Sequence, residues 1–249
     1  MVDARAGQRP SPRVEGRAAG LGWGVGALLV ATAAVMVVAL YMALVWAPPE
    51  RLQGQVYRIF FFHVPVSWVA YLAFAVTFAG GLAYLRSGRA SWDRAAAASA
   101  EVGVVFTTLS LVTGSIWGKP ILNAWWGWDV RLTTTLVLWL IYLGYLMIRA
   151  YAAEQAQGAR LAAVVGVVGF VVVPINFFSI RLWRGLHPGP NIGTEGGLEI
   201  EGAMAATLFV SLAAVTLLYI TLLVARIRLR SLTDAVGEIK ARLGVGGIR

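Results

Sequence analysis

Residues 21–47 read LGWGVGALLVATAAVMVVALYMALVWA, and no charged side chain lies between Arg17 and Glu50. A helix rises about 1.5 Å per residue, so about 20 apolar residues are enough to cross roughly 30 Å of hydrocarbon. Four arginines precede the run, as in a signal peptide, but the run is much longer than the roughly 7–15 residues of a signal-peptide core. We therefore predict that these residues form a retained membrane span.

Five further apolar runs follow, at residues 64–85, 95–116, 132–148, 161–180 and 203–225. Each is predicted to be helical, because a chain in lipid must satisfy its own backbone polar groups. The composition agrees: 13% of the residues are charged, about half the share in a typical soluble domain. We predict an all-α integral membrane protein, a bundle of six transmembrane helices over residues 21–225. Basic tails would occupy residues 1–20 and 226–249.

Positive charge is divided unevenly between the two sides of these spans. Of the 21 Lys and Arg residues, fifteen lie on the side of the two tails and six lie on the other side. Cytoplasmic loops carry the excess of Lys and Arg, so both termini are predicted to be cytoplasmic. The net charge of +9 is then mainly a topology signal, and we expect the lipid bilayer but no nucleic acid as a partner.

This topology places residues 48–62, 117–131 and 181–202 outside the cytoplasm. The middle segment reads WGKPILNAWWGWDVR and contains four of the ten tryptophans. An interfacial aromatic belt explains isolated tryptophans, but it does not require Gly, Pro, Asp and Arg beside them. The alternative is a platform for a large, flat, apolar ligand.

The chain has two histidines, His63 and His187, and both fall on the extracytoplasmic side. Taken singly, each is explained as an interfacial or solvated histidine. Taken together beside the Trp-rich segment, they indicate haem, which accepts two axial imidazoles and presents a flat apolar ring with anionic propionates. The chain has no cysteine, which excludes disulfides, iron–sulfur clusters, thiolate zinc sites and haem attached through cysteine.

Basic side chains on the same side could bind the propionates, because Arg offers a two-pronged donor to a carboxylate. Ordinary snorkelling at the membrane edge explains many of them equally well. Asp129 either orients a ligand or pairs with a neighbouring arginine. The basic candidates are Arg58, Lys119, Arg131, Arg181 and Arg184.

Residues 117–120 (WGKP) and 125–133 (WWGWDVRLT) resemble the tryptophan-rich "WWD" signature of haem-handling proteins in cytochrome c maturation. Together with RIFFFHVP at residues 58–65 and six spans, they make the chain most similar to the CcmC family over about residues 21–225. Leu122 and Asn123 depart from the pattern, which leads us to expect an aromatic residue and a glycine. The resemblance implies axial ligands at His63 and His187, propionate contacts at Arg58 and Arg131, and a platform of Trp117, Gly118, Trp125, Trp126, Trp128 and Asp129.

The resemblance also implies a function and partners. The protein would bind haem b non-covalently through bis-histidine ligation and deliver it to the periplasmic haem chaperone CcmE. It would act beside the ATP-binding cassette subunits CcmA and CcmB and the small membrane protein CcmD. No GxxxxGK[ST] motif is present, so ATP would be used by a partner, and we expect a haem-transfer protein rather than an enzyme.

Two other functions remain open at this point. One is a non-haem scaffold subunit of an ATP-binding cassette transporter, in which the Trp-rich segment is only a docking surface. The other is a secondary transporter, which should show ionisable or broken-helix positions near the midplane, and these spans largely lack them. Glu101 is the one charge well inside a span, and we expect it to snorkel or to pair with Arg94.

The topology gives a direct test with reporter fusions. A reporter fused after Ile116 should signal an extracytoplasmic position, and one fused after Ile148 a cytoplasmic position, because one span separates them. Each position is tested with two reporters, a phosphatase that is active only outside the cytoplasm and a fluorescent protein that fluoresces only in the cytoplasm. Same-side signals from both fusions would contradict the topology.

Overall fold

The computed structural model describes residues 15–183 and 202–243. His187 and most of the third predicted outside segment lie outside these residues. The described part contains helices and no named strand, and six of its helical stretches are long and apolar enough to cross a membrane. The predicted all-α fold with six spans is confirmed. The elements are α1 Glu15–Tyr41, η1 Met42–Trp46, η2 Gln55–Ile59, α2 Phe60–Ser87, α3 Ala90–Leu122, α4 Val130–Tyr151, α5 Gln155–Gly169, α6 Val172–Leu182 and α7 Gly202–Arg242.

The long α3 helix changes the expected border of the Trp-rich segment. It continues to Leu122, so Trp117 and Gly118 belong to its last turns instead of a loop. Asn123 ends the helix in the left-handed conformation, with φ of 54°. After glycine, asparagine is the residue most often found in this conformation at a helix end. This explains how Asn123 can stand where the resemblance leads us to expect glycine.

The fifth predicted span is two helices, α5 and α6, with a break at Phe170 and Val171. The span predicted over residues 161–180 is confirmed within Gln155–Leu182, but its helix is interrupted at this point. Pro174 accounts for the break, because its ring clashes with the carbonyl four residues earlier, that of Phe170, and it has no N–H to donate to it. The Phe170 carbonyl instead accepts a hydrogen bond from Val173 N at 2.9 Å.

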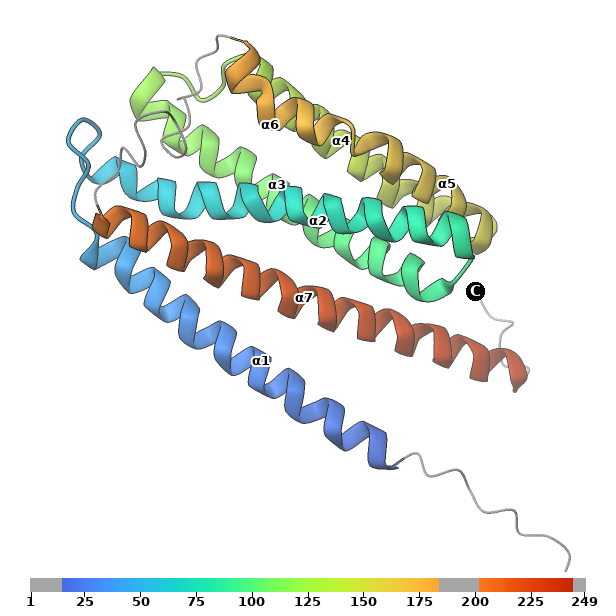
Figure 1. The fold of residues 1–249 in the computed structure, drawn as a ribbon. Coiled ribbons are helices and arrows are strands. Elements are labelled where there is room, and N and C mark those ends of the chain that lie inside the picture. The colour runs from blue at the N-terminus through green and yellow to red at the C-terminus, as the bar shows by residue number, and fades with distance from the viewer. Residues whose placement is uncertain (1–14, 184–201, 244–249) are drawn as a thin grey trace, which may run out of the picture.

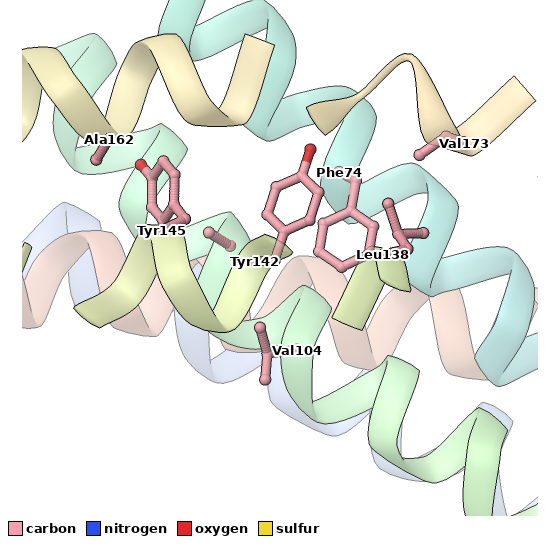
Figure 2. Packing of buried hydrophobic residues seen from close by; sticks show 8 residues of the cluster. Phe74, Val104, Leu138, Tyr142, Tyr145, Ala162 and Val173 are labelled. Atoms are coloured by element: carbon pink, nitrogen blue, oxygen red, sulfur yellow. The ribbon is translucent and has the colours of Figure 1, made fainter. Parts of the chain in front are cut away.

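The helices pack around the pair formed by α2 and α3, as Figure 1 shows. α4, α5 and α6 cover one side of this pair, whereas α7 packs on the other side and is itself covered by α1. The largest core cluster joins α2, α3, α4, α5 and α6, and its buried residues are drawn in Figure 2. The rings of Phe74 and Tyr142 stack with centroids 3.7 Å apart, and the Tyr142 hydroxyl donates to the Gly166 carbonyl at 3.2 Å.

The outer segments meet at one end of the bundle. Figure 1 shows the start of α2, the end of α3, the start of α4, the end of α6 and the start of α7 at the same end. Trp117 Nε1 donates to Gln53 Oε1 at 2.9 Å, which joins the first and second segments. Met204 and Leu208 of α7 pack in one cluster with Tyr57. The predicted grouping of the outer segments is thus confirmed for their described parts.

Ion pairs concentrate at the opposite end. Glu101 of α3 pairs with both Arg226 and Arg230 of α7, and Arg94 pairs with Asp234 at 3.2 Å. The expected partner of Glu101, Arg94, is therefore wrong. The reason is that α7 continues as a helix past residue 225, which brings its own arginines beside Glu101.

A close approach between α2 and α3 gives a stability test. A Cβ atom at Gly103 would lie 2.7 Å from the buried Phe74 ring, whereas one at Gly144 would meet nothing within 4 Å. We expect Gly103→Ala to destabilise the protein by about 1–3 kcal/mol through overpacking. The matched variant Gly144→Ala should be neutral or slightly stabilising, because alanine favours helix. Thermal unfolding in detergent measures both, and equal melting temperatures would contradict the packing.

Candidate functional site

A pocket lies where α2, α3 and α4 meet, at the end of the bundle that holds the Trp-rich segment. Cofactor and ligand pockets are mostly apolar, with a few precisely placed polar groups. The lining follows this pattern, because aromatic and aliphatic side chains surround one imidazole, one guanidinium and several hydroxyl groups. The chemistry of the lining therefore suits a flat, mainly apolar ligand that carries acidic groups.

One wall is a single face of α2. His63, Ser67 and Tyr71 are spaced four residues apart and so stack along one side of the helix. The Ser67 hydroxyl donates to the His63 carbonyl at 2.7 Å, and its oxygen lies 2.6 Å from the Ser110 hydroxyl of α3. These bonds fix α2 against α3 directly beneath the imidazole.

The hydrogen bond of His63 to Thr113 favours one tautomer of the imidazole. The Thr113 hydroxyl donates its one hydrogen to the Leu109 carbonyl at 2.7 Å. This bond favours an Nδ1–H of His63 as the donor to the Thr113 oxygen, which lies 3.0 Å from Nδ1. A proton on Nδ1 leaves the lone pair of the neutral imidazole on Nε2, the form that binds a metal through Nε2. Gly114 makes room for the ring, since a Cβ there would lie 3.1 Å from His63 Cε1.

Tryptophans form the second wall. The Trp117 ring meets the His63 ring edge-on at 5.7 Å and is held through its indole nitrogen by Gln53. Trp126 lines the pocket with a buried Nε1 that has no hydrogen-bond partner among the described residues. Trp128 packs edge-on against Trp126 at 5.6 Å but is itself 78% exposed. Trp125 also lines the pocket and is largely exposed.

Arg131 supplies the cation of the pocket. It lies in the first turn of α4, which begins where Asp129 accepts a hydrogen bond from Leu132 N at 2.7 Å. Its Nη2 donates to the Tyr71 hydroxyl at 3.5 Å. Its Nη1 is buried and has no hydrogen-bond partner in the described part of the chain. A buried charged donor without an acceptor is costly, so this atom suits an anionic ligand group.

A buried polar network holds Arg131 in place. The Asn176 side chain of α6 is fully buried; its amide nitrogen lies 2.9 Å from the Arg131 carbonyl, and its oxygen accepts from the Tyr71 hydroxyl. The same nitrogen lies 2.7 and 2.8 Å from the hydroxyls of Thr134 and Thr135. Asn176 therefore joins α6 to α2 and α4 immediately behind the pocket.

The structure brings together six of the ten predicted site residues in the pocket lining: His63, Trp117, Gly118, Trp125, Trp126 and Arg131. Trp128 and Asp129 lie beside the pocket. Trp128 packs against Trp126, and Asp129 caps the start of α4. Arg58 does not line it, because its guanidinium donates to the Ala43 and Ala47 carbonyls at 2.6 and 3.0 Å and also to Gln55. His187 lies outside the described residues.

Sequence reasoning missed several pocket residues. Ser67 and Tyr71 follow His63 at intervals of four residues and so share its face of α2. A helical projection that starts at His63 would have found both. Gly114 carries a weaker signal, as a glycine within a span close to the Trp-rich segment. Asn176 carries none, because its approach to Arg131 depends on the break between α5 and α6.

The fold and the pocket define a polytopic membrane protein with an aromatic, cationic cavity at one end of its helical bundle. The chain matches the family model CcmC, described as heme exporter protein C, over residues 19–242. Because this match covers most of its length, the chain belongs to the CcmC family.

Individual relatives agree with this assignment. The chain is 36% identical over 201 residues to heme exporter protein C of Bradyrhizobium diazoefficiens, covering 81% of this chain and 76% of that protein. It is 35% identical over 210 residues to heme exporter protein C of Escherichia coli K12, covering 83% of each. A ccmC-like mitochondrial protein of Marchantia polymorpha, named for cytochrome c biosynthesis, is 32% identical over 176 residues, 71% of this chain and 74% of that protein.

The bond between Thr113 and His63 predicts a spectroscopic change. Replacing Thr113 by Val removes the acceptor for Nδ1–H, so the neutral imidazole should shift toward the Nε2–H form, whereas Thr113→Ser should keep the Nδ1–H form. Nitrogen NMR of the histidine-labelled protein measures this, because the chain has only two histidines and so few signals. Identical spectra for the wild type and Thr113→Val would contradict the assigned tautomer.

Proposed function

We propose that this protein binds haem b as its cargo in the pocket beside His63 and delivers it to a periplasmic haem chaperone of the CcmE type. The family's description as heme exporter protein C supports haem as the cargo. The observation that carries the proposal is the pocket's pair of buried donors without a hydrogen-bond partner among the described residues, Trp126 Nε1 and Arg131 Nη1, in a lining that also contains the imidazole of His63. Haem fits this donor set, since it offers carboxylates, a flat apolar ring and an iron that accepts imidazole.

His63 is proposed as one axial ligand, through Nε2. The hydrogen bond to Thr113 orients the ring in the manner of the outer partners that usually hold metal-binding histidines. His187 is proposed as the second ligand. It belongs to the segment between α6 and α7, whose flanking helix ends lie at the same end of the bundle as the pocket.

Arg131 is proposed to bind a haem propionate. Its free donor and the neighbouring Tyr71 hydroxyl present two polar groups on the same side of the pocket. Of the two arginines predicted for this task, Arg131 is favoured, because Arg58 would first have to break its hydrogen bonds to the carbonyls of Ala43 and Ala47. We assign Arg58 an indirect contribution, which is to fix the loop that carries Gln53 and thereby Trp117.

The tryptophans are proposed as a platform with a sheltered and an open part. Trp117 and Trp126 line the inner wall, whereas Trp125 and Trp128 remain largely exposed at the mouth. An exposed edge of the macrocycle there would be accessible to a partner. Moderate affinity suits this task, because a carrier that releases slowly cannot transfer.

The wider assembly follows from the family and stays part of the proposal. The protein would work with the transporter subunits CcmA and CcmB and with CcmD, which would supply any ATP-driven step. Its pocket end would face the periplasm from the cytoplasmic membrane, with both termini in the cytoplasm. In this role the protein carries the haem without changing it chemically.

The ligand assignment is tested by haem retention. Purified wild-type protein should show a haem Soret band, and His63→Ala and His187→Ala should each weaken retention and alter the spectrum. Arg131→Gln should lower affinity by about 10- to 100-fold, the worth of a charge-assisted hydrogen bond. Arg51→Gln, an exposed cation at the same end, is the matched control and should change nothing. Colourless wild-type protein would favour a scaffold or transporter instead, and unchanged spectra in both histidine variants would defeat the axial assignment.

The platform is tested by transfer. Trp126→Ala should impair loading of the chaperone more than membrane insertion. The change removes part of the pocket wall, whereas Trp126 itself lies between the helices α3 and α4 and not within a span. Trp92→Ala, a partly exposed tryptophan at the opposite end, is the matched control. Covalent haem on the chaperone measures loading, and normal loading by Trp126→Ala would contradict the platform role.

A further inference from the structure

The last turns of α7 expose an apolar stripe, which we call the seam. It consists of Leu229, Leu232, Val236 and Ile239, each between 50% and 65% exposed. The spacing of three, four and three residues is that of the a and d positions of a coiled-coil heptad. Leu222 and Ala225 continue the same spacing into the membrane-spanning part of the helix. The pattern indicates a surface suited to another helix.

The seam faces away from the bundle. Asp234 pairs with Arg94 of α3, and Arg226 and Arg230 pair with Glu101 on the same helix. These contacts occupy the side of α7 that packs on α3. The residues of the seam project from the opposite side of the helix. The described part of the chain provides nothing that covers them, as their exposure shows.

The seam also extends beyond the hydrocarbon. α7 has 41 residues and so measures about 60 Å, roughly twice the thickness of the hydrocarbon core. The pair between Arg94 and Asp234 places residue 234 beside the first turns of α3, and Figure 1 shows α7 continuing past the end of that helix. Lipid tails therefore do not account for the apolar side chains of its last two turns.

Charge along α7 is segregated around the seam. The positions that flank the last turns of the seam hold Lys240 on one side and Arg242 on the other, with no acidic residue, whereas Arg226 is already paired with Glu101 of α3. Such flanking positions set partner choice through ion pairs. A second copy of this chain would bring like charges together. A membrane surface would require the helix to bend flat, yet α7 is one uninterrupted helix held along α3.

We propose that the seam docks an amphipathic helix of a partner protein whose apolar stripe is flanked by Asp and Glu. The partner helix would lie on the side of the membrane where α7 ends, opposite the pocket. Its apolar residues would cover Leu232 and Val236, and its carboxylates would meet the basic flanks. This inference does not depend on the identity of the ligand in the pocket.

Site-specific photo-crosslinking of the full-length protein in cells tests the docking. A photo-reactive residue in place of Leu232 should give a protein adduct at least tenfold stronger than one in place of Glu238, an exposed position of similar height outside the seam. The partner peptide identified in the adduct should be an amphipathic helix with acidic flanks. An adduct of twice the chain's mass, adducts with lipid alone, or equal yields from both positions would each overturn the proposal.

A second set of variants tests the two parts of the surface separately. With the crosslinker at position 232, Ile239→Lys should reduce the adduct at least tenfold because it interrupts the apolar stripe. The double variant Lys240→Glu with Arg242→Glu should reduce it similarly, because it places acid against acid. These residues are exposed, so membrane levels and haem retention should match the wild type. Undiminished adduct in the double variant would overturn the requirement for an acidic partner.

Discussion

Lipid offers no hydrogen bonds, so every polar group that enters the bilayer must find its partner within the protein. This constraint organises the bundle. Ser99 of α3, for example, donates to the Ala73 carbonyl of α2 at 2.7 Å and lies 2.9 Å from the Tyr219 hydroxyl of α7, which ties three helices together. The constraint also makes its exceptions informative. Among the described residues the buried side-chain atoms without a partner are Trp126 Nε1, Arg131 Nη1 and Arg230 Nε.

Two of these three atoms line the same pocket, and that coincidence is the physical core of the functional argument. A buried indole N–H and a buried guanidinium N–H each lose hydration without compensation, which costs about 1–3 kcal/mol or more for a charged group. A ligand with acceptor groups at the pocket would remove this cost on binding. The cavity thus favours an anionic, largely apolar molecule before any relative is considered.

The break between α5 and α6 is part of the same arrangement. An uninterrupted helix would carry Asn176 on a different axis, whereas the turn at Phe170 starts a new helix that packs on α4. There Asn176 binds the Arg131 carbonyl, while Tyr71 contacts the guanidinium of that arginine. Since α6 ends just before the segment that contains His187, the network ties the chain near one proposed iron ligand to the proposed propionate site.

The sequence was sufficient for the spans, because apolar runs in lipid have one structural outcome, and for most of the pocket, because the Trp-rich motif is local. It was insufficient wherever a feature depends on two segments meeting. Thr113, Tyr71 and Asn176 have ordinary sequence surroundings, and their roles arise from contacts between helices. Arg58 shows the converse: its place in the motif predicts a ligand contact, but its geometry commits it to the end of α1.

The length of α7 was also hidden, since residues beyond 225 are too polar to read as a span, although they continue the helix. Ion pairs with α3 explain why that continuation is ordered: Glu101 and Arg94 give it partners over about two turns. Most helical stability in proteins comes from tertiary contacts, and these ion pairs supply such contacts to the continuation of α7. A helix held in this way presents its outer face at a fixed height and direction. The exposed heptad spacing therefore belongs to a helix that ion pairs anchor on α3 as far as Asp234, which distinguishes it from a basic tail that merely completes the topology.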